Sequence, residues 1–175
     1  MAVALVRYGA VPEVARFLLP EGMTLERGDC VVIDSSRGPM LGSVLEIARP
    51  AREPGQQLPD PEAAILRLAA PEDLAAAEEH RSRAMAGFSD WERRIADWHL
   101  DLQLVEVEFT LDGAKQILYV LNERGPDCTK LAIQAAAAGL GIIEVQPITA
   151  TGLVTQPTLK VSGGGGCGSG GCGCH

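Results

Sequence analysis

The hydrophobic pattern of this chain changes its period at Pro71, and that change limits the fold more than any other feature. Before Pro71, apolar residues fall in short runs parted by glycine and proline, as in strands joined by turns. After it, Phe88, Trp91, Ile95 and Trp98 recur at helical spacing, which favours burial of that stripe in a core. Strands followed by a long helix predict an α+β fold.

Residues 1–49 are expected to form a small β-barrel-like sheet. Four apolar runs, VALVRY, EVARFLL, DCVVID and MLGSVLEI, are parted there by turn residues. Residues 50–70 predict a proline-rich linker or extended crossing, because helix does not run easily through closely spaced prolines. Its prolines are Pro50, Pro54, Pro59 and Pro61.

Residues 71–148 predict an α+β layer in which helices cover one face of a sheet. The long amphipathic helix comes first, with Pro71 and two acids in its first turn. A β-hairpin follows, because alternating apolar residues flank the turn Asp112-Gly113. A helix that starts at Pro126 and a strand, GIIEVQPI, complete the layer. Residues 149–175 are expected to be a flexible tail rich in glycine and cysteine.

The composition indicates a globular protein with an acidic surface. The 175 residues carry a net charge of −8, and 46% of them are hydrophobic. This charge disfavours a non-specific nucleic-acid coat, which needs clustered lysine and arginine. The sequence contains neither an export signal nor a long apolar run, so we expect a cytoplasmic protein and no membrane contact.

The five cysteines favour metal or cluster binding over disulfides in such a compartment. The sequence ends in GGGGCGSGGCGCH, where Cys167, Cys172, Cys174 and His175 supply three thiols and one imidazole. Soft thiolates suit iron–sulfur clusters and zinc, and the glycines let the chain wrap a small centre. The spacing is not a standard zinc pattern. An iron–sulfur cluster, a zinc ion and an empty tail with incidental or redox-paired thiols therefore remain as alternatives.

Two further cysteines have ordinary interpretations. Cys30 lies within a predicted strand and is expected to be a small buried apolar residue. Cys128 lies in the first turn of the second helix, where the helix dipole lowers thiol pKa values. A cluster in the tail needs a fourth donor, from His175, a partner or one of these cysteines.

Five arginines are candidates for contact with RNA or a partner protein. Arg37 lies in the turn SRGP and is expected to project from the barrel, and four others form a basic strip on the long helix: Arg81, Arg83, Arg93 and Arg94. Acidic residues interleave with this strip, so a salt-bridged surface is the favoured alternative. His80 lies among charged residues and is expected on a solvated helix face.

Three segments resemble the polymerase-suppressor (PSP) C-terminal domain family in its bacterial YaaT/RicT-like form. They are LERGDCVVIDSSRGPMLGSVLEI, RLAAPEDLAAAEEH and LDLQLVEVEFTLDGAKQILYVL. The tail resembles the glycine-led cysteine motif of that family in Gly163, Gly164, Gly166, Cys167, Gly168 and Cys172. It departs from the motif at Gly173, which separates Cys172 from Cys174 where the family has adjacent cysteines. The parts together would form one PSP-type unit.

The resemblance implies a cytoplasmic adaptor that is not an enzyme and has no small-molecule substrate. It implies a regulatory role in RNA processing or maturation through protein partners, with an iron–sulfur cluster and with any RNA contact indirect. The alternative is a direct RNA-binding module that uses the barrel and the hairpin face and has a dispensable tail.

Overall fold

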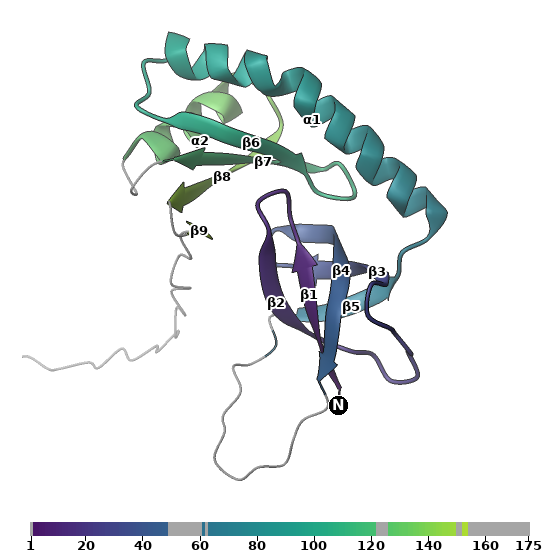
Figure 1. Ribbon diagram of the computed structural model, residues 1–175. Coiled ribbons are helices and arrows are strands. Elements are labelled where there is room, and N and C mark those ends of the chain that lie inside the picture. Colours follow the sequence, from purple (N-terminus) through teal and green to yellow (C-terminus); the bar gives the residue numbers. More distant parts are fainter. Residues whose placement is uncertain (1, 49–60, 62, 122–125, 150–151, 154–175) are drawn as a thin grey trace, which may run out of the picture.

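The computed structural model describes residues 2–48, 61, 63–121, 126–149 and 152–153 (Figure 1). Two sheets and two helices make up these residues, which confirms the predicted α+β class. In chain order the elements are β1 (Val3–Tyr8), β2 (Glu13–Leu18), β3 (Cys30–Ser35), β4 (Gly38–Ala48), β5 (Ala63–Leu68), α1 (Pro71–Asp97), β6 (Gln103–Phe109), β7 (Lys115–Leu121), α2 (Pro126–Ala137), β8 (Ile142–Thr149) and β9 (Gly152–Leu153). Within the described residues, no helix is both long and apolar enough to cross a membrane.

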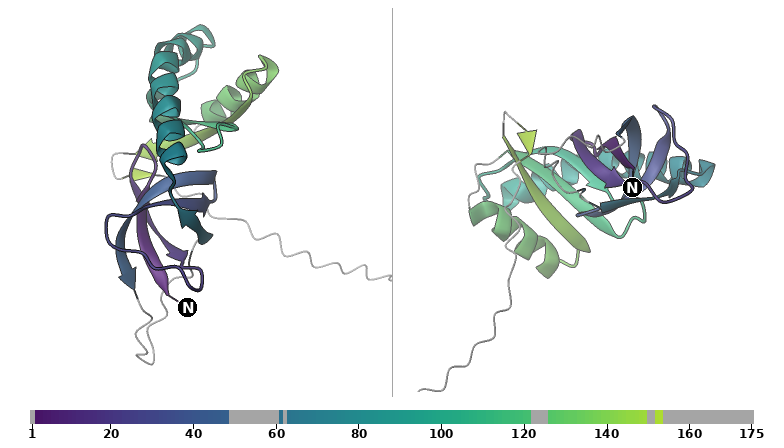
Figure 2. Two further views of the ribbon diagram at one scale, coloured as in Figure 1. Left: turned by 90° about the vertical axis from the view of Figure 1, so that its right-hand side faces the viewer. Right: turned by 90° about the horizontal axis from the view of Figure 1, so that it is seen from below.

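The first five strands close into a barrel in the order β1-β2-β5-β3-β4, with β4 pairing back to β1 (Figures 1 and 2). Alternate side chains point inward, as the period of a strand requires, so Ala4, Val6 and Tyr8 of β1 are all buried. Gly42 of β4 lies where β1 passes closely: a Cβ there would come within 2.3 Å of Val6 Cγ1. The barrel therefore depends on a residue without a side chain at position 42.

Strand β5 lies within the segment 50–70 that the sequence predicted to be a linker or an extended crossing. Its residues pair with β3 and, through Ala63 and Ala64, in parallel with the end of β2. The run AAILRL is short and follows closely spaced prolines, so the sequence pattern did not predict a strand there. β5 closes the barrel by contacts between residues far apart in the chain, which local patterns do not report.

The second sheet has the order β6-β7-β8-β9, with β7 and β8 parallel and the other neighbours antiparallel. β7 is buried on both faces. Leu118 and Val120 pack with Trp91 and Leu131 in a core shared with α1 and α2. The opposite face packs on the barrel.

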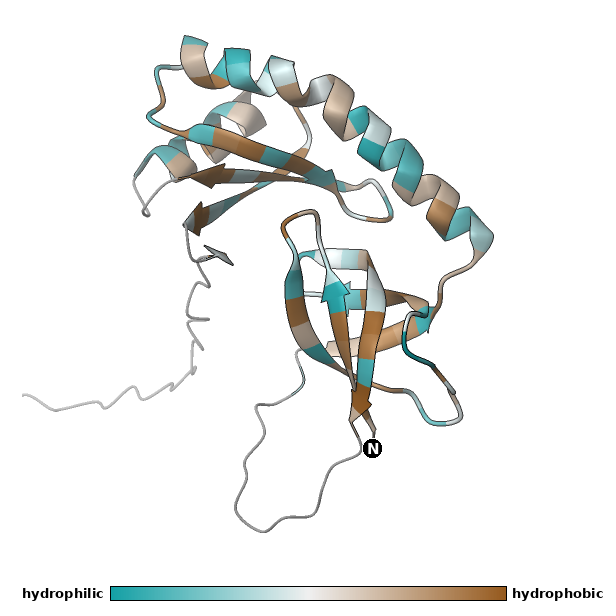
Figure 3. Ribbon diagram, in the orientation of Figure 1, coloured by the Kyte–Doolittle hydropathy of each residue, from teal (hydrophilic) through white to brown (hydrophobic). Residues whose placement is uncertain are grey.

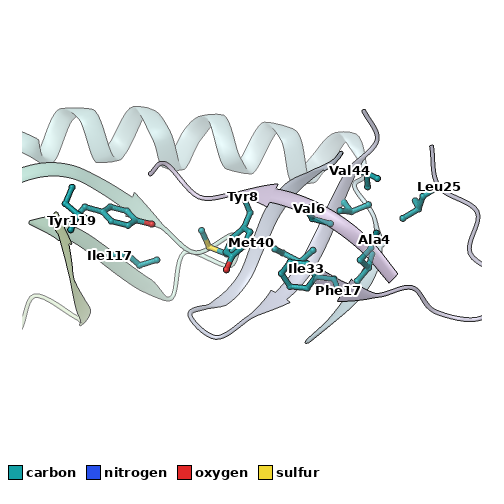
Figure 4. Packing of buried hydrophobic residues seen from close by; sticks show 13 residues of the cluster. Ala4, Val6, Tyr8, Phe17, Leu25, Ile33, Met40, Val44, Ile117 and Tyr119 are labelled. Carbon is teal, nitrogen blue, oxygen red and sulfur yellow. The ribbon is translucent and has the colours of Figure 1, made fainter. Parts of the chain in front are cut away.

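The barrel and the second sheet share one hydrophobic cluster (Figure 4). Ile117 and Tyr119 of β7 join Tyr8 and Met40 of the barrel in it. Figure 3 shows that apolar residues concentrate on the strands, whereas polar residues are interspersed along α1. The parts predicted separately from the sequence are thus packed against each other.

Both ends of α1 have identifiable signals. Asp73 Oδ2 accepts a 2.8 Å hydrogen bond from the Ala70 backbone N–H, and Pro71 occupies the first helical turn, as predicted. At the other end His99 adopts the left-handed φ of 54°, and the Leu100 N–H donates to the Ile95 carbonyl. These bonds satisfy backbone groups that a helix leaves unpaired at its ends.

Candidate functional site

A groove of about 560 Å³ lies where the barrel, α1 and β6 meet. Figure 1 shows α1 running from the barrel along the second sheet, so that its first half spans the junction. Ala77, Arg81 and Met85 line the groove from α1, Glu106 and Glu108 line it from β6, and the barrel contributes the start of β4 and the β1–β2 turn. The groove has the size of sites that hold a ligand or a few side chains.

A buried polar network lies beside the groove and joins the barrel to the second sheet. Arg37 Nη1 donates a 2.7 Å hydrogen bond to the Tyr119 hydroxyl, and Arg37 Nη2 pairs with the Glu13 carboxylate. The guanidinium also lies 5.4 Å from the ring centroid of Tyr8. Burial opposes its charge, but the attraction of Tyr119 and Glu13 outweighs that cost and raises the pKa of Arg37.

The sequence predicted that Arg37 projects from the barrel, and the structure instead buries it, with 5% of the residue exposed. The turn that carries Arg37 faces the second sheet, where Tyr119 offers a hydroxyl, and Glu13 of the barrel strand β2 supplies the opposite charge. This packing of two sheets has no signal in the local sequence. In the structure Arg37 joins two parts of the molecule.

The network continues from Tyr119 to Glu108. The Tyr119 hydroxyl donates a 2.6 Å hydrogen bond to Glu108 Oε2, and Glu108 Oε1 accepts one of 2.9 Å from the Ala10 backbone. Burial raises the pKa of both Glu108 and Tyr119, so Tyr119 keeps its proton and remains a donor. Both carboxylate oxygens of Glu108 are thus engaged inside the molecule.

The arginines of α1 differ in their surroundings. The Arg83 guanidinium lies 4.1 Å from the ring centroid of Phe109, and that of Arg94 lies 5.3 Å from the ring of Trp91. Arg93 pairs with Asp90, as the salt-bridged interpretation predicts. Arg81 has no hydrogen bond, ion pair or ring contact within the described part of the chain, and it is exposed in the groove.

His80 also lines the groove, and the sequence did not reveal its surroundings. It is partly buried rather than on a solvated face: its Nε2 lies 3.2 Å from the Leu111 carbonyl, and its ring lies 5.9 Å from that of Phe109. A Cβ at Gly113 would come within 2.9 Å of the imidazole. The tight Asp112-Gly113 turn is the sequence signal that could have predicted this position of His80, because a glycine backbone leaves room for the imidazole ring.

The predicted cluster ligands Cys167, Cys172, Cys174 and His175 lie outside the described residues. Within those residues, no three His, Cys, Asp or Glu side chains gather as a metal site would require.

The two cysteines that the structure describes differ from their expectations. Cys30 is exposed rather than buried. Cys128 is partly buried, and burial together with Asp127 raises the pKa of its thiol, against the lowering expected from the helix dipole. Of the two, Cys30 is therefore the more accessible donor.

Comparison with known proteins places this geometry in context. The family model described as the PSP1 C-terminal conserved region matches residues 63–136, which begin at β5 and end within α2. The stage 0 sporulation protein YaaT of Bacillus subtilis (strain 168) is 30% identical to the chain over 129 residues. The matched part is 74% of this chain and 46% of YaaT, so the chain spans about half the length of that curated relative. No solved structure matches the chain.

Proposed function

The chain belongs to the PSP C-terminal family, and on that premise we propose that it is a regulatory adaptor that acts by binding other proteins and is not itself an enzyme. The observation that carries the proposal is the relation to YaaT, which extends over 74% of the chain. YaaT is by its name a sporulation protein, which supports a regulatory role for this chain. We further propose that the role lies in RNA processing or maturation, in the cytoplasm.

The surface chemistry supports protein rather than RNA as the direct partner. The net charge of −8 opposes binding to a polyphosphate chain. Of the five arginines considered for RNA contact, Arg37 is buried, and Arg83, Arg93 and Arg94 are engaged within the molecule. Glu106 and Glu108 line the groove next to Arg81 and would face a bound phosphate chain. Any RNA in the assembly would therefore be held mainly by the partner.

Affinity capture of the tagged full chain from its native cells tests this proposal. Half of each lysate is treated with ribonuclease before capture, and bound proteins are quantified by mass spectrometry. We expect the same protein partners in both halves. Partners that disappear after nuclease treatment would instead identify a module that binds RNA directly, and capture of no protein would refute the adaptor.

We also propose that the tail holds an iron–sulfur cluster. The donor set fits: Cys167, Cys172 and Cys174 offer three thiolates, and His175 or Cys30 can supply a fourth donor. The cluster would supply a centre sensitive to iron and redox state, and the glycines around the cysteines leave the backbone free to reach it. The role of the residues is to bind and orient, which orders the tail when the ligand is present.

Metal analysis of protein prepared without oxygen tests the tail. Iron and acid-labile sulfide in the wild type are compared with those in the variant Cys167→Ser, Cys172→Ser, Cys174→Ser, and Cys128→Ser is the matched control. We expect iron and sulfide in the wild type and the control and their loss in the triple variant. Zinc without sulfide would instead identify a zinc site, and protein free of both metals would refute metal binding by the tail.

A further inference from the structure

The groove at the junction of the barrel, α1 and β6 contains a cation, Arg81, that the described part of the chain leaves without a partner. Arg81 has no ion pair, hydrogen bond or ring contact among the residues the structure describes. The neighbouring acids do not compensate it: Glu108 accepts hydrogen bonds from Tyr119 and Ala10. Glu106 lies more than salt-bridge distance away and accepts from the Val107 backbone. An unpaired guanidinium in a concave site suits a carboxylate, which it can bind through two parallel hydrogen bonds.

Apolar surface adjoins this cation. Met85 lies one helical turn after Arg81, lines the same groove and is 68% exposed. Leu74 and Ala77 precede Arg81 on the same face of α1, and Leu74 is 47% exposed. Exposed methionine is typical of surfaces that bind apolar side chains of varied shape. This face of α1 has no covering element in the described structure.

The edge of β6 limits how an occupant can bind. β6 is an outer strand of its sheet, and such an edge can accept an added strand from another chain. Here the Glu106 carboxylate accepts a 3.0 Å hydrogen bond from the Val107 N–H, which occupies a backbone donor of this edge strand. At Val107 the edge therefore has no free donor for an added strand, which favours an occupant that binds through its side chains.

We propose that this groove docks a segment of a partner protein that carries an apolar side chain for Met85 and, close by, a carboxylate for Arg81. The argument is charge complementarity: one carboxylate satisfies Arg81, which is unpaired among the described residues, whereas a phosphate chain carries a negative charge at every nucleotide and would bring several past Glu106 and Glu108. The inference rests on the proposed adaptor function and adds the surface and the chemistry of its partner.

Site-specific photocrosslinking of the full chain in its native cells tests the proposal. The photoreactive residue p-benzoylphenylalanine replaces Met85, and in the control it replaces Glu79, which is exposed on α1 but does not line the groove. We expect a protein crosslink at position 85 and none at 79. The crosslinked peptide should contain an apolar residue with Asp or Glu nearby in its sequence.

Charge reversal then tests the cation. Arg81→Glu should lower the yield of the crosslink at position 85 by about tenfold or more, since it places two carboxylates in contact. Arg93→Glu, an exposed arginine outside the groove, should leave the yield unchanged. Replacing the partner's acid by lysine should restore the crosslink to Arg81→Glu. Because Arg81 is exposed, circular dichroism and the denaturation midpoint should match the wild type.

Four results would overturn the docking surface while leaving the adaptor function intact. In the first, proteins are captured but none crosslinks at position 85. In the second, crosslinks form equally at positions 85 and 79, and in the third the crosslink yield at position 85 is unchanged by Arg81→Glu. Crosslinking of position 85 to RNA would overturn it as well. If affinity capture finds no protein partner at all, both the adaptor function and this docking surface are refuted.

Discussion

Arg37 of the barrel donates a 2.7 Å hydrogen bond to the hydroxyl of Tyr119 in the second sheet, and both residues are buried. Arg37→Met should lower the free energy of unfolding by about 3 kcal/mol or more, because it leaves the Glu13 charge and the Tyr119 hydroxyl without their partner. Tyr119→Phe should cost about 1–3 kcal/mol, because Arg37 and Glu108 both lose a hydrogen bond. Urea denaturation measures both values.

A matched control for this pair is Arg93→Ala, which removes an exposed arginine from an exposed ion pair. It should change stability by less than about 0.5 kcal/mol. Equal effects of Arg37→Met and Arg93→Ala would show that the buried network does not join the barrel to the sheet.

Two glycine substitutions should have opposite effects. Gly42→Ala places a Cβ 2.3 Å from Val6 Cγ1 and should destabilise the barrel by about 1–3 kcal/mol. Gly87→Ala lies inside α1 with open space around it, and should stabilise the protein by about 0.5–1 kcal/mol, because alanine is the better helix former. Thermal denaturation of both variants measures the difference, and a stabilising Gly42→Ala would contradict the barrel packing.

The start of α1 should give the protein an acid-sensitive contribution to stability. Hydrogen bonds from Arg67 and from the Ala70 backbone lower the pKa of Asp73 from 3.8 to about 2. A lowered carboxyl pKa stabilises the folded state above pH 3.8, and this stabilisation is lost as the pH falls through about 2. The wild type should therefore exceed Asp73→Asn in stability at pH 6, and the difference should shrink below pH 4. Denaturation curves recorded across this range would contradict the assignment if the difference stayed constant.

Features set by neighbouring residues could be predicted from the sequence. The long helix begins at Pro71 as predicted, and Trp91 and Ile95 of its apolar stripe are buried in the core as predicted. Both features could be predicted because helical spacing and first-turn residues are local signals. The hairpin at Asp112-Gly113 joins β6 and β7 as predicted, for the same reason.

Features set by distant parts of the chain could not be predicted. β5 forms a strand because it lies between β2 and β3 in the closed barrel. The six residues of β5 carry no pattern that predicts this pairing. Arg37 is buried because the second sheet presents Tyr119 to it, 82 positions along the chain. Both depend on the packing of elements, which periodicity does not encode.

The candidate site divides in the same way. The sequence identified Arg81 as one of four arginines on a helix. The structure shows that the other three contact Phe109, Trp91 and Asp90, and that Arg81 has no such contact among the described residues. The groove itself combines three elements and has no sequence signature. The cysteine tail, in contrast, is a sequence feature alone and lies outside the described residues.

The mass of the native assembly tests the adaptor role most directly. The tagged full chain is isolated without oxygen from its native cells, treated with ribonuclease and analysed by light scattering, and its components are resolved on a denaturing gel. The account predicts a particle well above 18.5 kDa that contains a second polypeptide in fixed ratio. A particle that contains this chain alone after nuclease treatment would contradict it.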